Sequence, residues 1–363
     1  MAVAQGSVES VAVTSRFWAG KRVFLTGHTG FKGGWLALWL TELGADVHGY
    51  ALQPPTRPSL FDVVGLERRI AASTIADVRD GAALAAAMRA ARPDVVFHLA
   101  AQPLVRQSYR DPVETYATNV MGSVHLLEAV RGMDCVRAVV NVTTDKCYEN
   151  HERPEPYGES DPMGGHDPYS SSKGCAELVT AGYRRSFLSA KGVRVATARA
   201  GNVIGGGDWA EDRLIPDFLR AIDAGRKLEI RSPHATRPWQ HVLEPVSGYM
   251  MLAQRLCEGG EAFDGAWNFG PSLDDAKPVQ WIVQKLCESV PGASWCIGDS
   301  PQPHEAHMLS LDSTRARSLL EWRPRWALPD ALQRTLTWHL AWKAGHDLHA
   351  LCVEQIRAHQ AAA

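Results

Sequence analysis

The sequence predicts an α/β protein: a Rossmann-type, doubly wound parallel sheet with a smaller mixed α/β domain that binds substrate. Three observations lead to this fold class. Short apolar runs alternate with longer amphipathic segments from Lys21 to Arg199, a glycine-rich turn follows the first run, and the composition changes after Arg199. A chain of 363 residues is also long for one hydrophobic core, because domains typically contain about 100–200 residues. We therefore expect two cooperating domains.

The apolar runs of the first 200 residues predict parallel strands. Runs such as "RVFLTG", "DVVFHLAA" and "AVVNVTT" are continuous rather than alternating, which is typical of strands that are buried on both faces. Segments of helical length separate them, such as "GWLALWLTELGA" and the alanine-rich stretch 81–91. We therefore assign residues 17–200, together with roughly 238–260, to a cofactor-binding domain.

After Arg199 the sequence predicts shorter elements. "GNVIGGGDW" is rich in glycine, and proline, tryptophan and charged residues then interleave through "RSPHATRPWQHV" and "WNFGPSLDDAKP". This composition indicates short elements joined by loops, lying over the carboxyl ends of the sheet strands. We expect residues 201–237 and 261–345 to form the substrate-binding domain, residues 1–16 to be a disordered extension and residues 346–363 to form a C-terminal tail helix.

Composition excludes several classes of protein. Lys and Arg total 38 against 40 for Asp and Glu, so no net charge favours nucleic acid or an acidic membrane surface. The sequence contains no apolar run of roughly 18 residues and no secretory leader, so we expect a cytoplasmic protein. Its seven cysteines lack C-x-x-C spacing, and "HEAH" at 304–307 lacks the spacing of a zinc motif, so we expect no metal. The expected partner is a small molecule.

The glycine-rich turn predicts a dinucleotide site. Gly27, Gly30 and Gly33 form G-x-x-G-x-x-G between a predicted strand and a predicted helix, where backbone N–H groups can approach a pyrophosphate. The alternative is a strand-to-helix turn with packing glycines. The second strand ends in "GYALQPP", with Gln53 where an acid would bind the ribose, so the choice between NAD and NADP stays open. Lys32 either neutralises phosphate or faces solvent.

Two later segments fit the same site. Asp77 follows a third short apolar segment and can accept a hydrogen bond from an adenine amine, although a solvated turn acid explains it equally well. "HLAAQP" ends a strand in small residues, which let a cofactor lie close to the backbone.

The segment "HDPYSSSKGCAELV" predicts a helix with a catalytic pair on one face. Asp167 suits the N-cap and Pro168 the first turn, so Tyr169 and Lys173 lie one turn apart. A phenol has a reference pKa of about 10, and a nearby ammonium favours the phenolate and lowers that pKa. Together with a hydroxyl at Thr144 on the preceding strand, this pair can remove a proton from an alcohol whose carbon gives up hydride.

At these residues the chain resembles the extended short-chain dehydrogenase/reductases that act on nucleotide sugars. The resemblance extends through "AGNVIGGGDW", "RLIPD", "RPWQHVLEP" and "WNFGP", and covers about residues 18–345. These strings are most similar to the 4,6-dehydratases of the family, and within them to the branch that acts on CDP-glucose. The resemblance implies NAD as cofactor, CDP-glucose as substrate and a homodimer built around the helix that carries Tyr169.

The resemblance also implies roles for individual residues. The catalytic set is Thr144, Asp145, Lys146, Tyr169 and Lys173. The cofactor-binding set is Gly27, His28, Gly30, Phe31, Lys32, Gly33, Asp77, Val78, Leu99, Ala100, Ala101, Gln102, Asn119, Tyr169 and Lys173. The substrate-binding set is Gln102, Thr144, Asn202, Arg237 and Asn268, with Asn202, Arg237 and Asn268 at the diphosphate. A surface arginine stacked on Trp239 is the alternative for Arg237.

Asp145 and Lys146 distinguish elimination from simple oxidation. Dehydration needs one group to accept the C5 proton and another to protonate the leaving C6 hydroxyl, whereas a dehydrogenase or 4-epimerase needs neither. Related dehydratases carry Glu where this chain has Lys146, so Asp145 is the expected acid and Lys146 the expected base if it is neutral. Alternatively, a charged Lys146 stabilises the enolate. Other possibilities are a solvent-exposed turn, a 4-epimerase, a dehydratase of another nucleotide sugar, or an inactive nucleotide-binding module.

Overall fold

The computed structural model describes residues 13–298 and 308–362, and its centre is a seven-stranded parallel sheet. The strand order is β11-β6-β5-β4-β1-β2-β3, and every neighbouring pair is parallel. This is the doubly wound α/β fold that the sequence predicts. The strands are β1 (Arg22–Thr26), β2 (Asp46–Ala51), β3 (Ala72–Ile75), β4 (Val95–His98), β5 (Ala138–Val142), β6 (Arg194–Ala200) and β11 (Gly265–Phe269).

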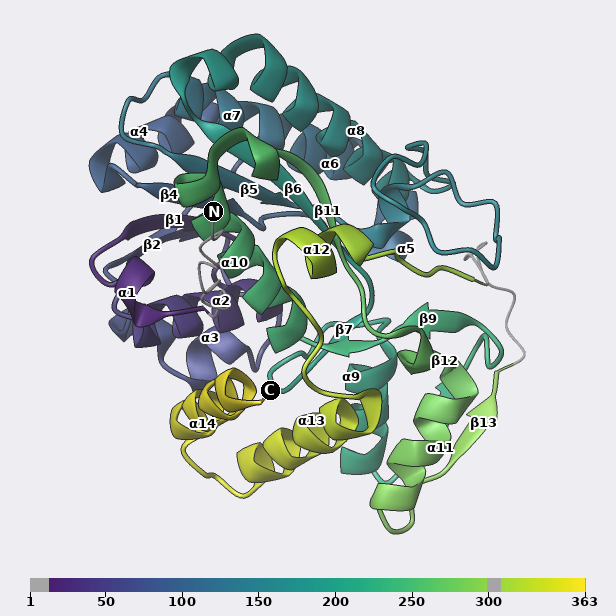
Figure 1. The fold of residues 1–363 in the computed structure, drawn as a ribbon. Coiled ribbons are helices and arrows are strands. Elements are labelled where there is room, and N and C mark those ends of the chain that lie inside the picture. The colour runs from purple at the N-terminus through teal and green to yellow at the C-terminus, as the bar shows by residue number, and fades with distance from the viewer. Residues whose placement is uncertain (1–12, 299–307, 363) are drawn as a thin grey trace, which may run out of the picture.

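Helices cover both faces of this sheet, as Figure 1 shows. Each face has its own core of buried apolar side chains, because parallel strands linked by crossover helices are covered on both sides. One face carries α2 (Phe31–Glu42), α10 (Leu243–Gly259) and α14 (Leu348–Ala361). The other face carries α4 (Gly81–Ala91), α7 (Gly122–Arg131) and α8 (Pro168–Tyr183).

The sequence signals for these elements work as expected. All residues of β4 and β5 are buried, in agreement with their continuous apolar runs. Helix α8 begins where the sequence predicts: the Asp167 side chain caps it by accepting from Ser170 N at 2.9 Å, and Pro168 occupies the first turn. The remaining helices around the sheet are α1 (Ser15–Trp18), α3 (Leu60–Val63), α5 (Val105–Arg110), α6 (Pro112–Tyr116) and α12 (Thr314–Leu319).

A smaller region lies beyond the carboxyl ends of the sheet strands and has its own apolar core. It contains three two-stranded sheets: β7 (Val203–Ile204) with β10 (Gln240–His241), β8 (Leu228–Ile230) with β13 (Trp295–Ile297), and β9 (Thr236–Pro238) with β12 (Ala276–Pro278). Its helices are α9 (Leu214–Asp223), α11 (Val279–Ser289) and α13 (Leu328–Lys343).

Some segments differ from the domain limits expected from the sequence. Strand β11 falls in the range 261–345, yet it pairs with β6 in the main sheet, because "GAWNF" follows a helix that returns the chain to the sheet edge. The segment 346–363 contains α14, whose Cys352 and Ile356 lie in the main core. Of the expected extension 1–16, residues 1–12 lie outside the described part, while Ser15 begins α1. The described helices include none that is long and apolar enough to cross a membrane.

Candidate active site

The carboxyl ends of β1, β4, β5 and β6 open into a cavity of about 660 Å³. Its other wall comes from the smaller region, including the segments around residues 202–217 and 228–239. Strand order reverses between β1 and β4, and such a switch point is where doubly wound sheets bind ligands. The cavity therefore combines a site for a dinucleotide with a site for a second ligand.

The glycine-rich loop has little space for side chains at two of its glycines. A Cβ on Gly27, whose φ is +81°, would lie 2.8 Å from Ala100 N, and one on Gly33 would lie 2.1 Å from Gly27 O. A Cβ on Gly30 would make ordinary contacts, so the protein itself does not require glycine there. Gly30 caps helix α2 without a side-chain hydrogen bond, which leaves the helix N-terminus available to an anion. This loop fits a dinucleotide pyrophosphate.

Several of the expected cofactor residues support this loop from behind the cavity. Thr26 Oγ1 accepts from Leu99 N and Ala100 N, each at 3.1 Å, and thereby joins the ends of β1 and β4. The Asn119 amide accepts from Gln102 N at 2.8 Å and donates to Gln102 O at 3.1 Å. Of the expected residues here, Leu99 and Ala101 line the cavity, whereas Ala100, Gln102 and Asn119 do not.

The Gln102 side chain does not point into the cavity. Its amide donates to Leu104 O and Thr115 Oγ1, and its carbonyl oxygen accepts from Leu104 N. These bonds engage both ends of the side chain, so the geometry gives no support to a substrate contact. Asn119 also donates to Ser172 Oγ, which connects this loop to the first turn of α8.

His28 and Asp77 also lie outside the cavity wall. His28 is buried, its Nε2 lies 2.8 Å from Ser73 Oγ, and burial lowers its pKa to about 4, so the ring is neutral. The Asp77 carboxylate is bound by the Arg79 guanidinium, and these hydrogen bonds hold its pKa below the usual value. Val78 packs against Gly122 in the core. Asp77 is thus a turn acid with an arginine partner.

Tyr169 and Lys173 face the cavity from the first turns of α8. Lys173 Nζ donates to Val142 O at 3.3 Å, and burial lowers its pKa to about 8 against the opposing charge of Glu177. Burial raises the Tyr169 pKa to about 12, and a hydrogen bond with Thr144 opposes this rise. The sequence-based expectation of a lowered tyrosine pKa is therefore wrong, because desolvation outweighs the effects of Thr144 and the Arg213 cation.

Asp145 is a buried carboxyl with one uncommitted oxygen. It begins a 3-10 turn, η3 (Asp145–Cys147), directly after β5, and is 3% exposed. Thr144 Oγ1 donates to Asp145 Oδ1 at 3.0 Å, whereas Oδ2 has no hydrogen-bond partner among the described residues. Burial raises the Asp145 pKa, although the cations of Lys146, Arg237 and Lys32 oppose the rise. A carboxyl in these surroundings favours the protonated state, as a proton donor requires.

The expected substrate residues divide into two groups. The cavity is lined by Asn202, Thr144 and Arg237, and also by Lys146 of the expected catalytic set. Arg237 is only 5% exposed, which excludes the alternative that it is a surface arginine. Asn268 lies elsewhere. Its amide donates to the backbone oxygens of two other residues and accepts from Tyr148 Oη at 2.7 Å, so its side chain is committed to the protein interior.

Two features of the cavity were not predicted from the sequence: the place of Arg213 in its wall and the partner of Lys32. Arg213 lines it and pairs with Asp208 at 3.0 Å; its place directly before α9 in the quoted string "RLIPD" was the available signal. Lys32 points inward, toward Tyr249 on α10, and no pattern in an apolar helix indicates such a partner. The described residues contain no cluster of metal-binding side chains, and "HEAH" at 304–307 lies outside them.

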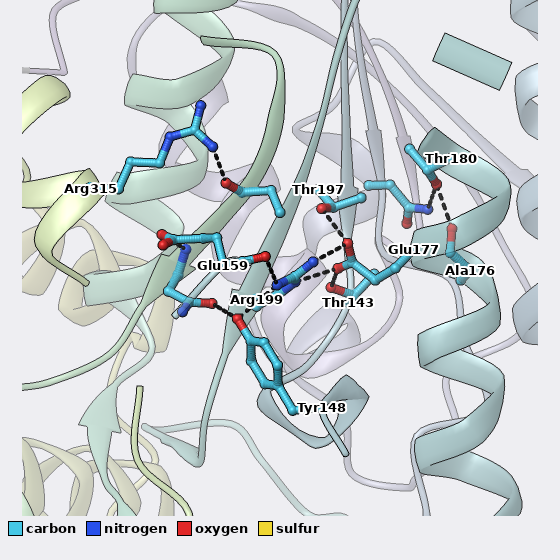
Figure 2. Close-up of polar contacts among 12 residues, drawn as sticks. Thr143, Tyr148, Glu159, Ala176, Glu177, Thr180, Thr197, Arg199 and Arg315 are labelled. Carbon is cyan, nitrogen blue, oxygen red and sulfur yellow. Dashed lines mark hydrogen bonds and ion pairs between the residues drawn. The ribbon is translucent and has the colours of Figure 1, made fainter. Parts of the chain in front are cut away.

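A second charged cluster lies behind the cavity, shown in Figure 2. Glu177 on α8 receives two hydrogen bonds from Arg199 on β6, at 2.8 and 2.9 Å, and one each from the hydroxyls of Thr143 and Thr197. Arg199 also donates to Tyr148 Oη at 2.7 Å. Burial lowers the Arg199 pKa, but the bonds to Glu177 outweigh it, so the net pKa is raised.

Comparison with known proteins agrees with this geometry. Residues 24–335 match the family described as GDP-mannose 4,6 dehydratase. The chain belongs to this family.

Three proteins similar to this chain are two 4,6-dehydratases and one 4-epimerase. The chain is 54% identical to CDP-glucose 4,6-dehydratase of Salmonella typhimurium, over 93% of this chain and 95% of that protein. It is 29% identical to UDP-glucose 4-epimerase of Mycolicibacterium smegmatis, over 68% of this chain and 75% of that protein. The crystal structure of a dTDP-glucose 4,6-dehydratase from Streptomyces venezuelae, with NAD bound, has a TM-score of 0.76 and 26% identity, covering 90% of this chain and 99% of that chain.

Proposed function

We propose that this protein is a CDP-glucose 4,6-dehydratase that uses NAD and forms CDP-4-dehydro-6-deoxyglucose. The observation that carries the proposal is Asp145: a buried carboxyl with a raised pKa and an uncommitted oxygen, in the same cavity as Tyr169 and Lys173. A 4-epimerase does not need such an acid. The 54% identity to the Salmonella enzyme supports CDP-glucose as the substrate.

The reaction is an elimination enclosed between an oxidation and a reduction. C4 is oxidised to a ketone, the C5 proton is removed, the C6 hydroxyl leaves as water, and the C5=C6 bond is then reduced by hydride at C6 and a proton at C5. The Gly27–Gly33 loop and Lys173 would hold NAD, which supplies reversible hydride acceptance when bound. The ketone is needed because it makes the neighbouring C5 proton acidic.

The chain's own residues move the protons. Tyr169 takes the proton of the C4 hydroxyl. Thr144, which is hydrogen-bonded to Tyr169, orients that hydroxyl. Asp145 gives its proton to the C6 oxygen as the C–O bond breaks, so that water leaves instead of hydroxide. Lys173 holds its positive charge beside Tyr169 and favours the phenolate that accepts the proton.

Lys146 is the proposed base at C5. It follows Asp145 on the turn and lines the same cavity. The alternative is that a charged Lys146 stabilises the enolate while another group moves the proton. Exchange of the C5 hydrogen with solvent deuterium in a Lys146→Ala variant decides between them: we expect the exchange to be lost, and undiminished exchange would exclude the base assignment.

The diphosphate of the substrate is proposed to lie against the basic wall of the smaller region. Arg237, Arg213 and Arg231 line that wall with Asn202, and a guanidinium donates paired hydrogen bonds to phosphate oxygens. Arg213 and Arg231 pair with acids of the same wall, at 3.0 Å to Asp208 and 2.9 Å to Asp212. Those ion pairs hold the guanidinium groups of Arg213 and Arg231 in place.

The test is incubation of the purified protein and NAD with CDP-glucose, followed by the alkali absorbance of 4-keto-6-deoxy products. We expect signal with CDP-glucose and much less with UDP-glucose or dTDP-glucose. Asp145→Asn is the matched control, because it removes the acid and preserves the shape of the side chain. A 4-epimer as the product would replace this proposal by an epimerase, and the absence of turnover of all three sugars would favour an inactive binding module.

A homodimer is proposed through α5, α6 and α8. These helices present large apolar side chains to solvent: Val113 is 78% and Leu178 64% exposed, and Tyr109 is also exposed. A second copy would cover them. Leu178→Arg should then yield a monomer in light scattering, whereas an unchanged mass would reject this interface.

The deoxysugar product is proposed to enter cell-surface glycans such as the O-antigen of lipopolysaccharide.

A further inference from the structure

Lys32 in the glycine-rich loop points into the cavity. The sequence suggests that it neutralises phosphate or faces solvent, but its amine lies 3.4 Å from Tyr249 Oη and 5.7 Å from the centroid of that ring. Tyr249 belongs to α10 and is fully buried. Lys32 is half-buried because its side chain forms part of the cavity wall. The glycine-rich loop thus carries a titratable group into the compartment of Asp145.

Four groups from four elements face this amine. They are Asp145 after β5, Lys173 on α8, Arg213 before α9 and Tyr249 on α10. Burial and, to a smaller extent, the cations of Arg213 and Lys173 lower the Lys32 pKa to about 7, while Asp145 opposes this lowering. Near neutral pH the amine therefore exists in both protonation states, and a negative charge on Asp145 favours the protonated one.

Elimination creates an electrostatic problem at Asp145. The C5–H electron pair becomes the C5=C6 π bond, the C6–O pair leaves with the oxygen, and the Asp145 proton completes the water molecule. This leaves a carboxylate that is 3% exposed and whose Oδ2 has no hydrogen-bond partner among the described residues. A buried charge is strongly unfavourable unless cations compensate it, and the cations that face Asp145 are Lys146, Arg237 and Lys32.

We propose that Lys32 is a positioning residue that acts through Asp145: its amine gains a proton as the carboxyl loses one, and so stabilises the carboxylate that elimination produces. The protons balance: the C4 hydroxyl and C5 each release one proton into this cavity, the formation of water consumes one, and C5 takes one back when hydride returns to C6. The same exchange in reverse restores the protonated acid for the next turnover. The proposal rests on the proposed acid role of Asp145.

The direct test titrates Asp145 without substrate. Infrared difference spectroscopy follows the carbonyl stretch of the protonated carboxyl, and Asp145→Asn assigns the band. Lys32→Met removes the compensating charge, so the Asp145 pKa should rise by about one pH unit or more. Lys32→Arg supplies a permanent cation, so that pKa should fall. A merely structural role would not move the titration in opposite directions.

Kinetics give the second readout. In Lys32→Met we expect kcat for CDP-glucose to fall about tenfold or more with KM little changed, since the charge acts on an acid–base step. The kcat–pH profile should move up in Lys32→Met and down in Lys32→Arg. Lys285→Met is the control, because Lys285 is an exposed lysine of α11 that does not line the cavity. If Lys32→Arg does not fold, Tyr249→Phe replaces it, with a smaller upward shift expected because the amine loses its acceptor.

The outcomes separate this proposal from the proposed function. If Asp145 titrates as in the parent protein in both Lys32 variants, the coupling is refuted whatever the enzyme's activity. Shifted titrations in a protein that does not dehydrate CDP-glucose would support the coupling and reject the function. A normal titration with a large loss of NAD binding would instead assign Lys32 to the cofactor.

Discussion

Two neighbouring threonines after β5 belong to two buried clusters of opposite character. Thr143 donates to Glu177 in the cluster of Figure 2, and Thr144 donates to Asp145 in the cavity. Successive side chains in an extended segment point to opposite faces, so one short stretch serves both. Both oxygens of Glu177 are occupied by donors, whereas one oxygen of Asp145 has no partner among the described residues.

The difference in hydrogen bonding sets the difference in charge. In the first cluster the guanidinium of Arg199 and two hydroxyls satisfy Glu177, and the arginine pKa is raised, so the arginine is held in its charged form. In the second cluster burial dominates the shifts of four groups and favours their neutral forms: upward for Asp145 and Tyr169, downward for Lys32 and Lys173. A saturated cluster stabilises the fold; an unsaturated one keeps groups ready to exchange protons.

The largest effect is expected from Asp145→Asn. Removing the proton donor should lower kcat by about 10²–10⁴-fold, the usual contribution of a general acid. Stability should respond differently. Burial raises the folded-state pKa of Asp145, so the stability that the carboxyl contributes is present at low pH and lost as pH rises through that pKa.

At neutral pH the Asn variant should therefore be at least as stable as the parent. Urea unfolding measures this, and a large loss of stability would assign Asp145 to the fold instead of the reaction.

Arg199→Met should show the opposite behaviour. It leaves the Glu177 carboxylate buried without the Arg199 guanidinium, which costs about 3–5 kcal/mol in the free energy of unfolding. Urea unfolding again gives the measurement, with an exposed pair as the control: Arg131→Met breaks the surface contact to Glu128 and should cost far less stability. Equal costs at the two sites would mean that burial does not distinguish them.

The fold was largely predictable because its signals are local. Continuous apolar runs identify β1, β4 and β5 as buried strands, and Asp167 with Pro168 marks the start of α8. Strand β11 was not assigned to the sheet, because "GAWNF" lies in a loop-rich stretch and its pairing with β6 is made across about 70 residues of chain. Long-range pairing of this kind leaves no local pattern.

The site was predictable where motif and geometry coincide. Tyr169, Lys173, Thr144 and Asp145 meet in one cavity because strand ends of a parallel sheet lie at one edge. Charge states were not predictable. The expected lowering of the Tyr169 pKa failed because desolvation depends on the three-dimensional surroundings. Asn268 was expected at the substrate, yet partners distant in sequence bind its amide.

Gly201→Ala tests whether the position of Asp145 Oδ2 in the cavity affects the reaction. A Cβ there would lie 2.5 Å from Pro238 Cγ and 3.0 Å from Asp145 Oδ2, the oxygen without a partner. We expect a stability loss of about 1–3 kcal/mol from overpacking and a larger proportional fall in kcat than in stability, because the carboxyl is displaced. Gly182→Ala on α8 is the control, since a Cβ there meets no atom within 4 Å. Unchanged kcat in Gly201→Ala would show that the position of Oδ2 does not matter.

The smallest effect is expected from the double variant Glu177→Gln/Arg199→Met, which makes the first cluster neutral. Removing both partners avoids an unpaired buried charge, so the double variant should be more stable than Arg199→Met alone.

The two clusters nevertheless communicate through Lys173. Burial lowers the pKa of this lysine to about 8, and the charge of Glu177 opposes that lowering. Without Glu177 the pKa should fall further, by up to about one unit. Activity that depends on the Lys173 ammonium would then decline at lower pH than in the parent, and kcat/KM measured across neutral to alkaline pH reports the shift. A profile that coincides with the parent's would show that Glu177 serves stability alone.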